Sequence, residues 1–219
     1  MGLILKAGIN LYLIKAATIA FFSIGFLIFL INYLPFLKTI FPDYTLQLGG
    51  LIGNTSFLGI PIANALIEAK FLPNDAINLS VGFDLGTTLF AWIFGPFFLQ
   101  ENATQIKLLN FKKLSNALIS SPASKGIIGV LIIYALGLEE DFGNWLSLPT
   151  TIVINLAILV VGTRLGIITN KKSAINKFKK PFKYSILLKL LIFPSLILIL
   201  CKILNFELDQ TTATVIQSG

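Results

Sequence analysis

The chain has 219 residues, of which 55% are hydrophobic and only 12% are charged, and it carries a formal net charge of +7. This balance departs from that of soluble globular domains and predicts an all-α membrane protein, because the apolar residues form continuous runs and not the alternating strands of a membrane barrel. Histidine is absent and Cys201 is the single cysteine, which excludes a disulfide framework, a Cys/His zinc site and a histidine-based catalytic triad within the chain.

The apolar runs predict a polytopic helix bundle with six membrane spans and the beginning of a seventh. Each of the six is long enough for the roughly 30 Å hydrocarbon core at about 1.5 Å per residue. The predicted spans are Leu11 to Leu34, Leu46 to Ala69 with a break at Pro61, Ile77 to Leu99, Leu114 to Gly137, Pro149 to Thr169, Pro181 to Leu204 and an incomplete span over 210–219. No linker or soluble domain is visible, so we expect residues 1–219 to form a single transmembrane domain in the lipid bilayer.

Clusters of lysine alternate with clusters of acid from one loop to the next. The positive-inside rule places the lysine-bearing loops 35–45, 100–113 and 170–180 in the cytoplasm, and the acidic loops with Glu139 and Glu207 outside. We therefore expect a multi-pass protein of the plasma (inner) membrane. Since topology accounts for the positive charge, we expect no nucleic-acid partner, and the residues suggest no cofactor and no metal.

The second predicted span holds Asn54, Thr55 and Ser56 shortly before Gly59 and Pro61. Proline cannot donate a backbone N–H and should break the helix here, which leaves polar backbone groups that protein or a water-filled cavity must cover. A half-helix beginning near Pro61 would direct free N–H groups and its positive dipole end into that cavity, an arrangement that suits an anion. The alternative is a proline kink whose small neighbours serve only helix packing, and the residues alone leave both open.

Two of the ionisable residues within the predicted spans are candidates for a function. Asp84 either couples a proton or cation or lies close enough to the outer surface to be hydrated. Lys189 either attracts an anion or pairs with a carboxylate, or it extends to the cytoplasmic surface. Intramembrane proteolysis needs a second carboxylate acting together with Asp84, and none lies in the interior of the spans, so we do not expect an enzyme. Close helix packing is predicted at Gly126, Gly129, Gly162 and Gly166.

Residues Gly53 to Pro61 resemble a known signature, the Asn-Thr-Gly-Phe-Leu-Gly-Leu-Pro motif of the auxin efflux carrier family, whose microbial members are described as permeases for malate, malonate and similar acids. Three further stretches are similar to this family in the same order. They are Ser121-Pro122 leading into Gly126, Val160 to Gly166, and Leu188 to Pro194. Together the matches cover nearly all of the chain, although Ser56 stands where the family usually has glycine.

The resemblance implies ten helices in two inverted repeats of five, with the fourth and ninth helices broken by proline and crossing at the midplane. Matched this way, the first predicted span is the family's third and the chain stops at Gly219 inside the ninth, so we expect a fragment that lacks two helices at the front and the tenth at the end. The resemblance implies a secondary transporter for a small organic anion such as a carboxylate, working by alternating access.

The same resemblance assigns the candidate site. The substrate carboxylate would be bound by Asn54, Thr55, Ser56, Gly59, Ile60 and Pro61, with Gln217 of the second repeat as the opposite wall. Asp84 and Lys189 would serve coupling or charge balance. The alternatives are a membrane scaffold that transports nothing and a sodium-coupled symporter of the bile-acid type, and a homodimer is the assembly that we consider.

Overall fold

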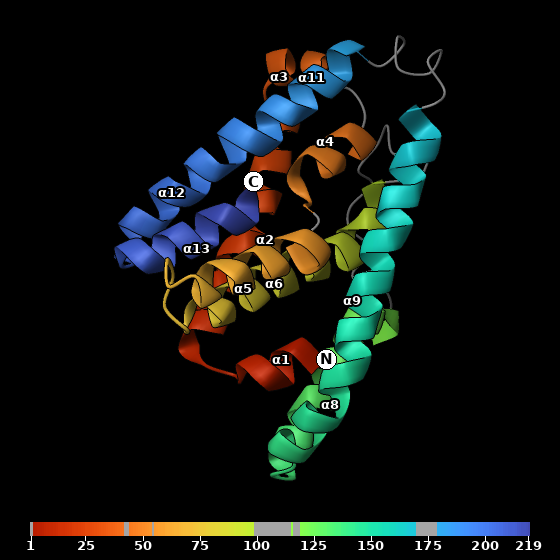
Figure 1. Cartoon of the computed structure of the whole chain (residues 1–219). Helices are drawn as coiled ribbons and strands as arrows, with labels where there is room; N and C mark the ends of the chain where they lie inside the picture. The colour runs from red at the N-terminus through yellow and green to blue at the C-terminus, as the bar shows by residue number, and fades with distance from the viewer. Residues whose placement is uncertain (1, 42–43, 54, 99–114, 116–118, 170–178) are drawn as a thin grey trace.

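The structure is a computed structural model that describes residues 2–41, 44–53, 55–98, 115, 119–169 and 179–219 (Figure 1). These residues form helices and the turns that join them, and no β-strand occurs among them, so the predicted all-α class is confirmed. The helices are α1 (Gly2–Ala7), α2 (Leu11–Tyr33), α3 (Pro35–Ile40), α4 (Tyr44–Leu51), α5 (Ile60–Glu68), α6 (Ala76–Phe98), α8 (Pro122–Ala135), α9 (Glu139–Thr169), α11 (Lys179–Leu187), α12 (Phe193–Ile203) and α13 (Leu208–Ser218). Two π-helical turns, η1 (Thr55–Gly59) and η2 (Leu188–Ile192), complete the order.

Three helices of the described chain are long and apolar enough to cross a membrane, namely Leu11–Tyr33, Ala76–Gly95 and Lys183–Ile203. They coincide with the first, third and sixth predicted spans. The third of them is a continuous helical run made of α11, η2 and α12. Length and composition thus support a membrane protein, as the sequence predicts.

The other predicted spans differ from the helices that form. The second is divided into α4, η1 and α5, and the incomplete seventh is α13. Of the fourth, only Ser124–Ala135 is a short apolar helix, and its predicted start lies outside the described residues. The fifth begins ten residues earlier than predicted, because Glu139 and its two acidic neighbours make the first turn of α9, where the helix dipole favours negative charge. Pro149 therefore lies inside α9 and does not begin a helix.

The fold is built around the contact between α2 and α6, whose backbones approach unusually closely. A Cβ atom at Gly82 would lie 2.3 Å from the carbonyl oxygen of Leu13, and one at Gly86 would lie 2.2 Å from that of Ala17. The two glycines are four residues apart and so share one face of α6, the spacing by which membrane helices pack backbone to backbone. The predicted packing position Gly126, by contrast, has no atom within 4 Å of where its Cβ would lie.

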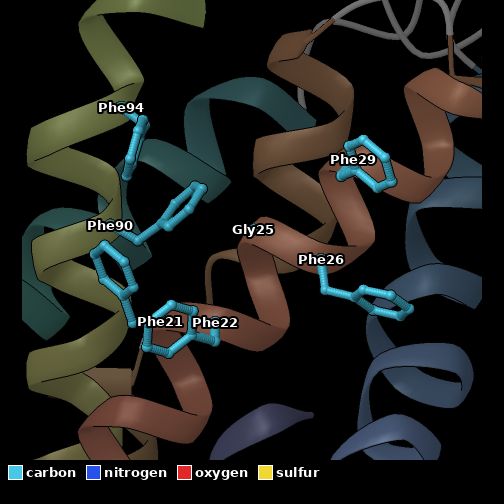
Figure 2. A pocket seen from close by; sticks show the side chains of 7 residues that line it. All are labelled: Phe21, Phe22, Gly25, Phe26, Phe29, Phe90 and Phe94. Atoms are coloured by element: carbon cyan, nitrogen blue, oxygen red, sulfur yellow. The ribbon is translucent and has the colours of Figure 1, made fainter. Parts of the chain in front are cut away.

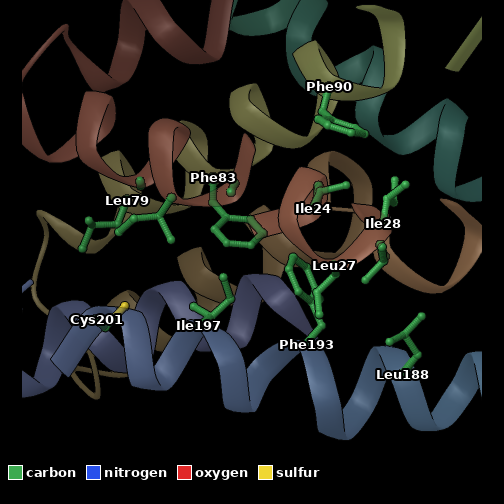
Figure 3. Packing of buried hydrophobic residues seen from close by; sticks show 14 of the residues in the cluster. Ile24, Leu27, Ile28, Leu79, Phe83, Phe90, Leu188, Phe193, Ile197 and Cys201 are labelled. Atoms are coloured by element: carbon green, nitrogen blue, oxygen red, sulfur yellow. The ribbon is translucent and has the colours of Figure 1, made fainter. Parts of the chain in front are cut away.

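An apolar core joins α2 and α6 to α12 and α13 (Figure 3). Phe83 and Phe193 are fully buried, and their ring centroids lie 6.1 Å apart across the α6–α12 interface. Ile24 of α2 and Ile197 of α12 are also completely buried in this cluster. The long α9 stands to one side of this core in Figure 1, next to α1 and α8. The core therefore holds α6 between the broken second span and the C-terminal helices.

The lysine-bearing ends of two segments lie at the same end of the molecule. Helices α3 and α11 lie together at one end of the cartoon (Figure 1). The ring of Phe41, which follows α3, packs edge-on against Tyr184 of α11 with centroids 6.5 Å apart. Part of the predicted loop 35–45 is helical as α3. The predicted cytoplasmic loops 100–113 and, for the most part, 170–180 lie outside the described residues, so their sidedness stays a prediction.

Candidate functional site

The second span is interrupted before Thr55. The interruption that the sequence predicted at Pro61 is therefore wrong in position. The helical backbone stops after Leu51 and resumes at Thr55, from where it continues through η1 and α5 to Glu68. Pro61 sits at the start of α5. Because the wider π-turn of η1 directly precedes it, the missing N–H of proline is accommodated without ending the helix. The half-helix that faces the break therefore begins six residues earlier than expected.

Asn54, the first predicted substrate ligand, lies outside the described residues. The next two, Thr55 and Ser56, turn toward α6 and meet Asp84. Thr55 Oγ1 donates a hydrogen bond to Asp84 Oδ1, and Ser56 Oγ donates a second one of 2.6 Å to the same oxygen. The half-buried carboxylate is thus held by two hydroxyl groups from the first turn after the break, and Thr87 adds a third hydroxyl 3.4 Å from that of Thr55.

Lys189 approaches the break from the other side. Its ammonium group lies 3.4 Å from the carbonyl oxygen of Leu51, the last residue of α4, and 5.3 Å from the centre of the Phe193 ring. A Cβ atom at Gly53 would lie 2.6 Å from Lys189 Nζ, so a side chain there would displace the ammonium from this position. A cation at the carbonyl end of α4 is favourable, because the helix dipole makes that end negative. The half-buried lysine therefore lies at the break itself.

Gln217 of α13 lies against η1. A Cβ atom at Gly59 would be 2.1 Å from Gln217 Oε1, so the amide occupies the space that any side chain at position 59 would need. Gln217 is 2% exposed, and neither Oε1 nor Nε2 has a hydrogen-bond partner among the described residues. Leaving one such buried group unsatisfied costs about 1–3 kcal/mol. Two unsatisfied atoms on one buried amide therefore call for an explanation.

The remaining predicted site residues have apolar surroundings. Ile60 is 1% exposed and belongs to a cluster with Leu13 and Val81. Its side chain therefore packs in the apolar core. Pro61 is half-buried beside it. The structure thus brings together Thr55, Ser56, Gly59, Gln217, Asp84 and Lys189 around the break, whereas the binding role of each stays a prediction.

A separate groove of about 560 Å³ lies between α2 and α6 (Figure 2). It is lined by Phe21, Phe22, Gly25, Phe26, Phe29, Phe90 and Phe94. Phe22, Phe26 and Phe29 are each more than half exposed, so the groove opens on the outer face of α2. It contains none of the polar groups of the break and offers nothing to bind a carboxylate, so we treat the break alone as the candidate site.

Comparison of the chain with models of protein families, with curated proteins and with solved structures finds no match in any of the three. The site therefore has to be interpreted from its own geometry. That geometry combines an interrupted helix, an ammonium group, a carboxylate held by hydroxyls and a buried amide without partners. The sequence singled out most of these residues but not Thr87, whose contact with Thr55 depends on which helices meet.

Proposed function

We propose that this chain forms part of a secondary transporter that moves a small organic anion bearing a carboxylate across a membrane, by alternating access at the break in the second span. The observation that carries the proposal is the buried amide of Gln217, which faces Gly59 with both polar atoms unsatisfied. A ligand carboxylate that accepts from Nε2 would supply the missing partner. The positive end of the helical run Thr55–Glu68 and the ammonium of Lys189 favour an anion in the same place.

The proposal includes an inverted-repeat architecture like that of the auxin efflux carrier family. The contact between Gly59 and Gln217 supports it, since the two residues stand at corresponding places in the two broken helices that the resemblance implies. Independently of the repeats, η1 and η2 each end two residues before a proline, Pro61 and Pro194, although they lie in the second and sixth predicted spans, which are not partners in the implied repeats. Both π-turns relieve the same missing N–H, and π-turns occur frequently at functional sites.

A second candidate function is a symporter that couples the anion to a cation, and the contacts of Asp84 favour it specifically. A carboxylate inside an apolar helix is rare and is usually paired or functional. Here the hydroxyls of Thr55 and Ser56 contact the carboxylate and that of Thr87 lies 3.4 Å from the Thr55 hydroxyl, and hydroxyl and carboxylate oxygens are the ligands that hard cations prefer. The scaffold alternative has no such specific observation in its favour.

The substitution Gln217→Leu tests the proposed site. We expect it to weaken the binding of small carboxylates by about tenfold or more, since a hydrogen bond to a charged group contributes about 1.5–3 kcal/mol and 1.4 kcal/mol is a factor of ten. The measurement is saturation binding of radiolabelled acetate, succinate and glycine to the purified chain in nanodiscs, followed by counterflow of any bound compound in liposomes. Thr212→Val is the matched control, because Thr212 is exposed on the same helix and its hydroxyl donates to the backbone carbonyl of Leu208 in that helix.

Two results would contradict the proposal. In the first, the folded chain binds none of the three carboxylates, which favours the scaffold. In the second, Gln217→Leu binds as tightly as the unchanged chain, which removes Gln217 from the site. Equal affinities for the Thr212→Val variant and the unchanged chain show that an altered α13 surface alone has no effect.

A further inference from the structure

Opposite charges flank the break in the second span. Lys189 Nζ lies 2.6 Å, and Thr55 Cγ2 lies 3.6 Å, from the position that a Cβ atom at Gly53 would occupy. The hydroxyl of the same Thr55 donates to Asp84 Oδ1. The ammonium and the carboxylate therefore both lie near Thr55, although they belong to residues 105 positions apart in the sequence.

Each charge keeps bonding capacity for another group. Both hydroxyls that bind Asp84 donate to Oδ1, which leaves Oδ2 to accept from a further donor. Of the three N–H donors of Lys189, one is directed at the carbonyl of Leu51 in a long bond of 3.4 Å. The two residues do not neutralise each other directly, since Lys189 bonds Leu51 and lies over Phe193 while Asp84 is held by η1. Gln217 adds an unsatisfied amide at Gly59, one turn further along η1.

The balance of charge decides what such a site accepts. Lys189 and Asp84 together carry no net charge, so a simple carboxylate brought between them leaves one negative charge in excess in apolar surroundings. Buried charges are tolerated when each one is paired. A molecule with an ammonium as well as a carboxylate keeps the total at zero and pairs both protein charges, each through charge-assisted hydrogen bonds.

We propose that the site takes a zwitterion, a small amino acid whose ammonium group binds Asp84 and whose carboxylate binds Lys189 and the Gln217 amide. This inference rests on the proposed transport function; it keeps the carboxylate of the substrate but adds an ammonium group, so that the substrate is neutral overall. Thr55 and Ser56 act as positioning residues, because they fix the carboxylate of Asp84 by two hydrogen bonds. Gly53 leaves room for the ammonium of Lys189 at the break, and a side chain at this position would displace it.

The test compares ligands that differ in one charged group. Binding of glycine, β-alanine and γ-aminobutyrate to the purified chain in nanodiscs is measured beside acetate, propionate and butyrate, which lack the ammonium, and methylamine, ethylamine and propylamine, which lack the carboxylate. At the best-fitting length we expect the amino acid to bind at least tenfold more tightly than its matched acid and its matched amine. This ranking is obtained on the unchanged chain, so it does not depend on the folding of any variant.

Variants then assign the two ends of the ligand. By the same balance of charge, Asp84→Asn should abolish or reverse the preference for the amino acid over its matched acid, while Asp84→Glu, which keeps the charge, should retain it. Lys189→Met should abolish binding of the acids. The matched controls are Asp75→Asn and Lys202→Met, which remove exposed charges from the loop before α6 and from the end of α12, and both should bind like the unchanged chain.

Three outcomes overturn the inference, and they separate it from the proposed function. If acids bind as tightly as amino acids at every length, an anion carrier stands and the zwitterion falls. If acids reach the affinity of the amino acids only when sodium chloride is added or the pH is lowered, a separate cation or proton neutralises Asp84 and the ammonium of the substrate does not. If no carboxylate compound binds, both proposals fall.

Discussion

Replacing Gly82 or Gly86 by alanine is expected to destabilise the protein more than any other single methyl group added to α6. A Cβ atom at either position would lie 2.2–2.3 Å from a backbone carbonyl oxygen of α2, and backbone cannot move aside as the end of a flexible side chain can. Overpacking of this kind costs about 3 kcal/mol, at the upper end of the usual range. For a domain of this size, that corresponds to a loss of about 6–12 °C in the melting temperature.

The expected result has a control on the same helix. Gly95 has no atom within 4 Å of where its Cβ would lie, so Gly95→Ala should leave the melting temperature unchanged or raise it slightly, because alanine favours a helix more than glycine does. The double variant Gly82→Ala/Gly86→Ala should lose less than the sum of the two single losses, since the first methyl group already separates α2 from α6. A melting temperature of Gly82→Ala equal to that of Gly95→Ala would show that the two helices do not pack backbone to backbone.

Much of the helical content could be predicted from the sequence, because continuous apolar runs can hardly fold otherwise. The runs at Leu11, Ala76 and Lys183 form the three helices of the described residues that are both long and apolar enough to span a membrane. The position of the break could not be predicted from the same local rules. They treat Pro61 as the end of a helix, whereas the π-turn Thr55–Gly59 relieves the missing N–H and moves the interruption to the residues around Gly53.

The candidate site was predictable by residue but not by contact. The sequence singles out Asp84 as a carboxylate within a span and Thr55 and Ser56 as hydroxyls in another, yet these residues are 28 and 29 positions apart and only the packing of η1 on α6 joins them. The close contact of α2 and α6 did leave a signal. Gly82 and Gly86 form a Gly-x-x-x-Gly pair, a recognised helix-packing motif. Close packing had been predicted instead at Gly126, Gly129, Gly162 and Gly166.

Removing the two hydroxyls that hold Asp84 should have the second large effect. In Thr55→Val/Ser56→Ala, the Asp84 carboxylate keeps its charge but loses both donors, and hydrogen bonds to a charged group contribute about 1.5–3 kcal/mol each. In an Asp84→Asn background, the same pair of substitutions removes only neutral hydrogen bonds, which contribute about 1 kcal/mol each. Thermal or denaturant unfolding of the four variants of this cycle measures the difference.

The size of that difference is what distinguishes a charged from a neutral group at position 84. If the carboxylate is charged and depends on η1, the hydroxyl substitutions must destabilise the chain with Asp84 by about 1–2 kcal/mol or more beyond their effect on the chain with asparagine. Only in the chain with Asp84 do they remove donors from a charged group. Thr212→Val serves as the control, since its hydroxyl is exposed and bonds the carbonyl of Leu208 in its own helix. Equal losses in both backgrounds would mean that η1 packs on α6 without holding a charge. Asp84 could then not be the residue that binds the ammonium of a substrate.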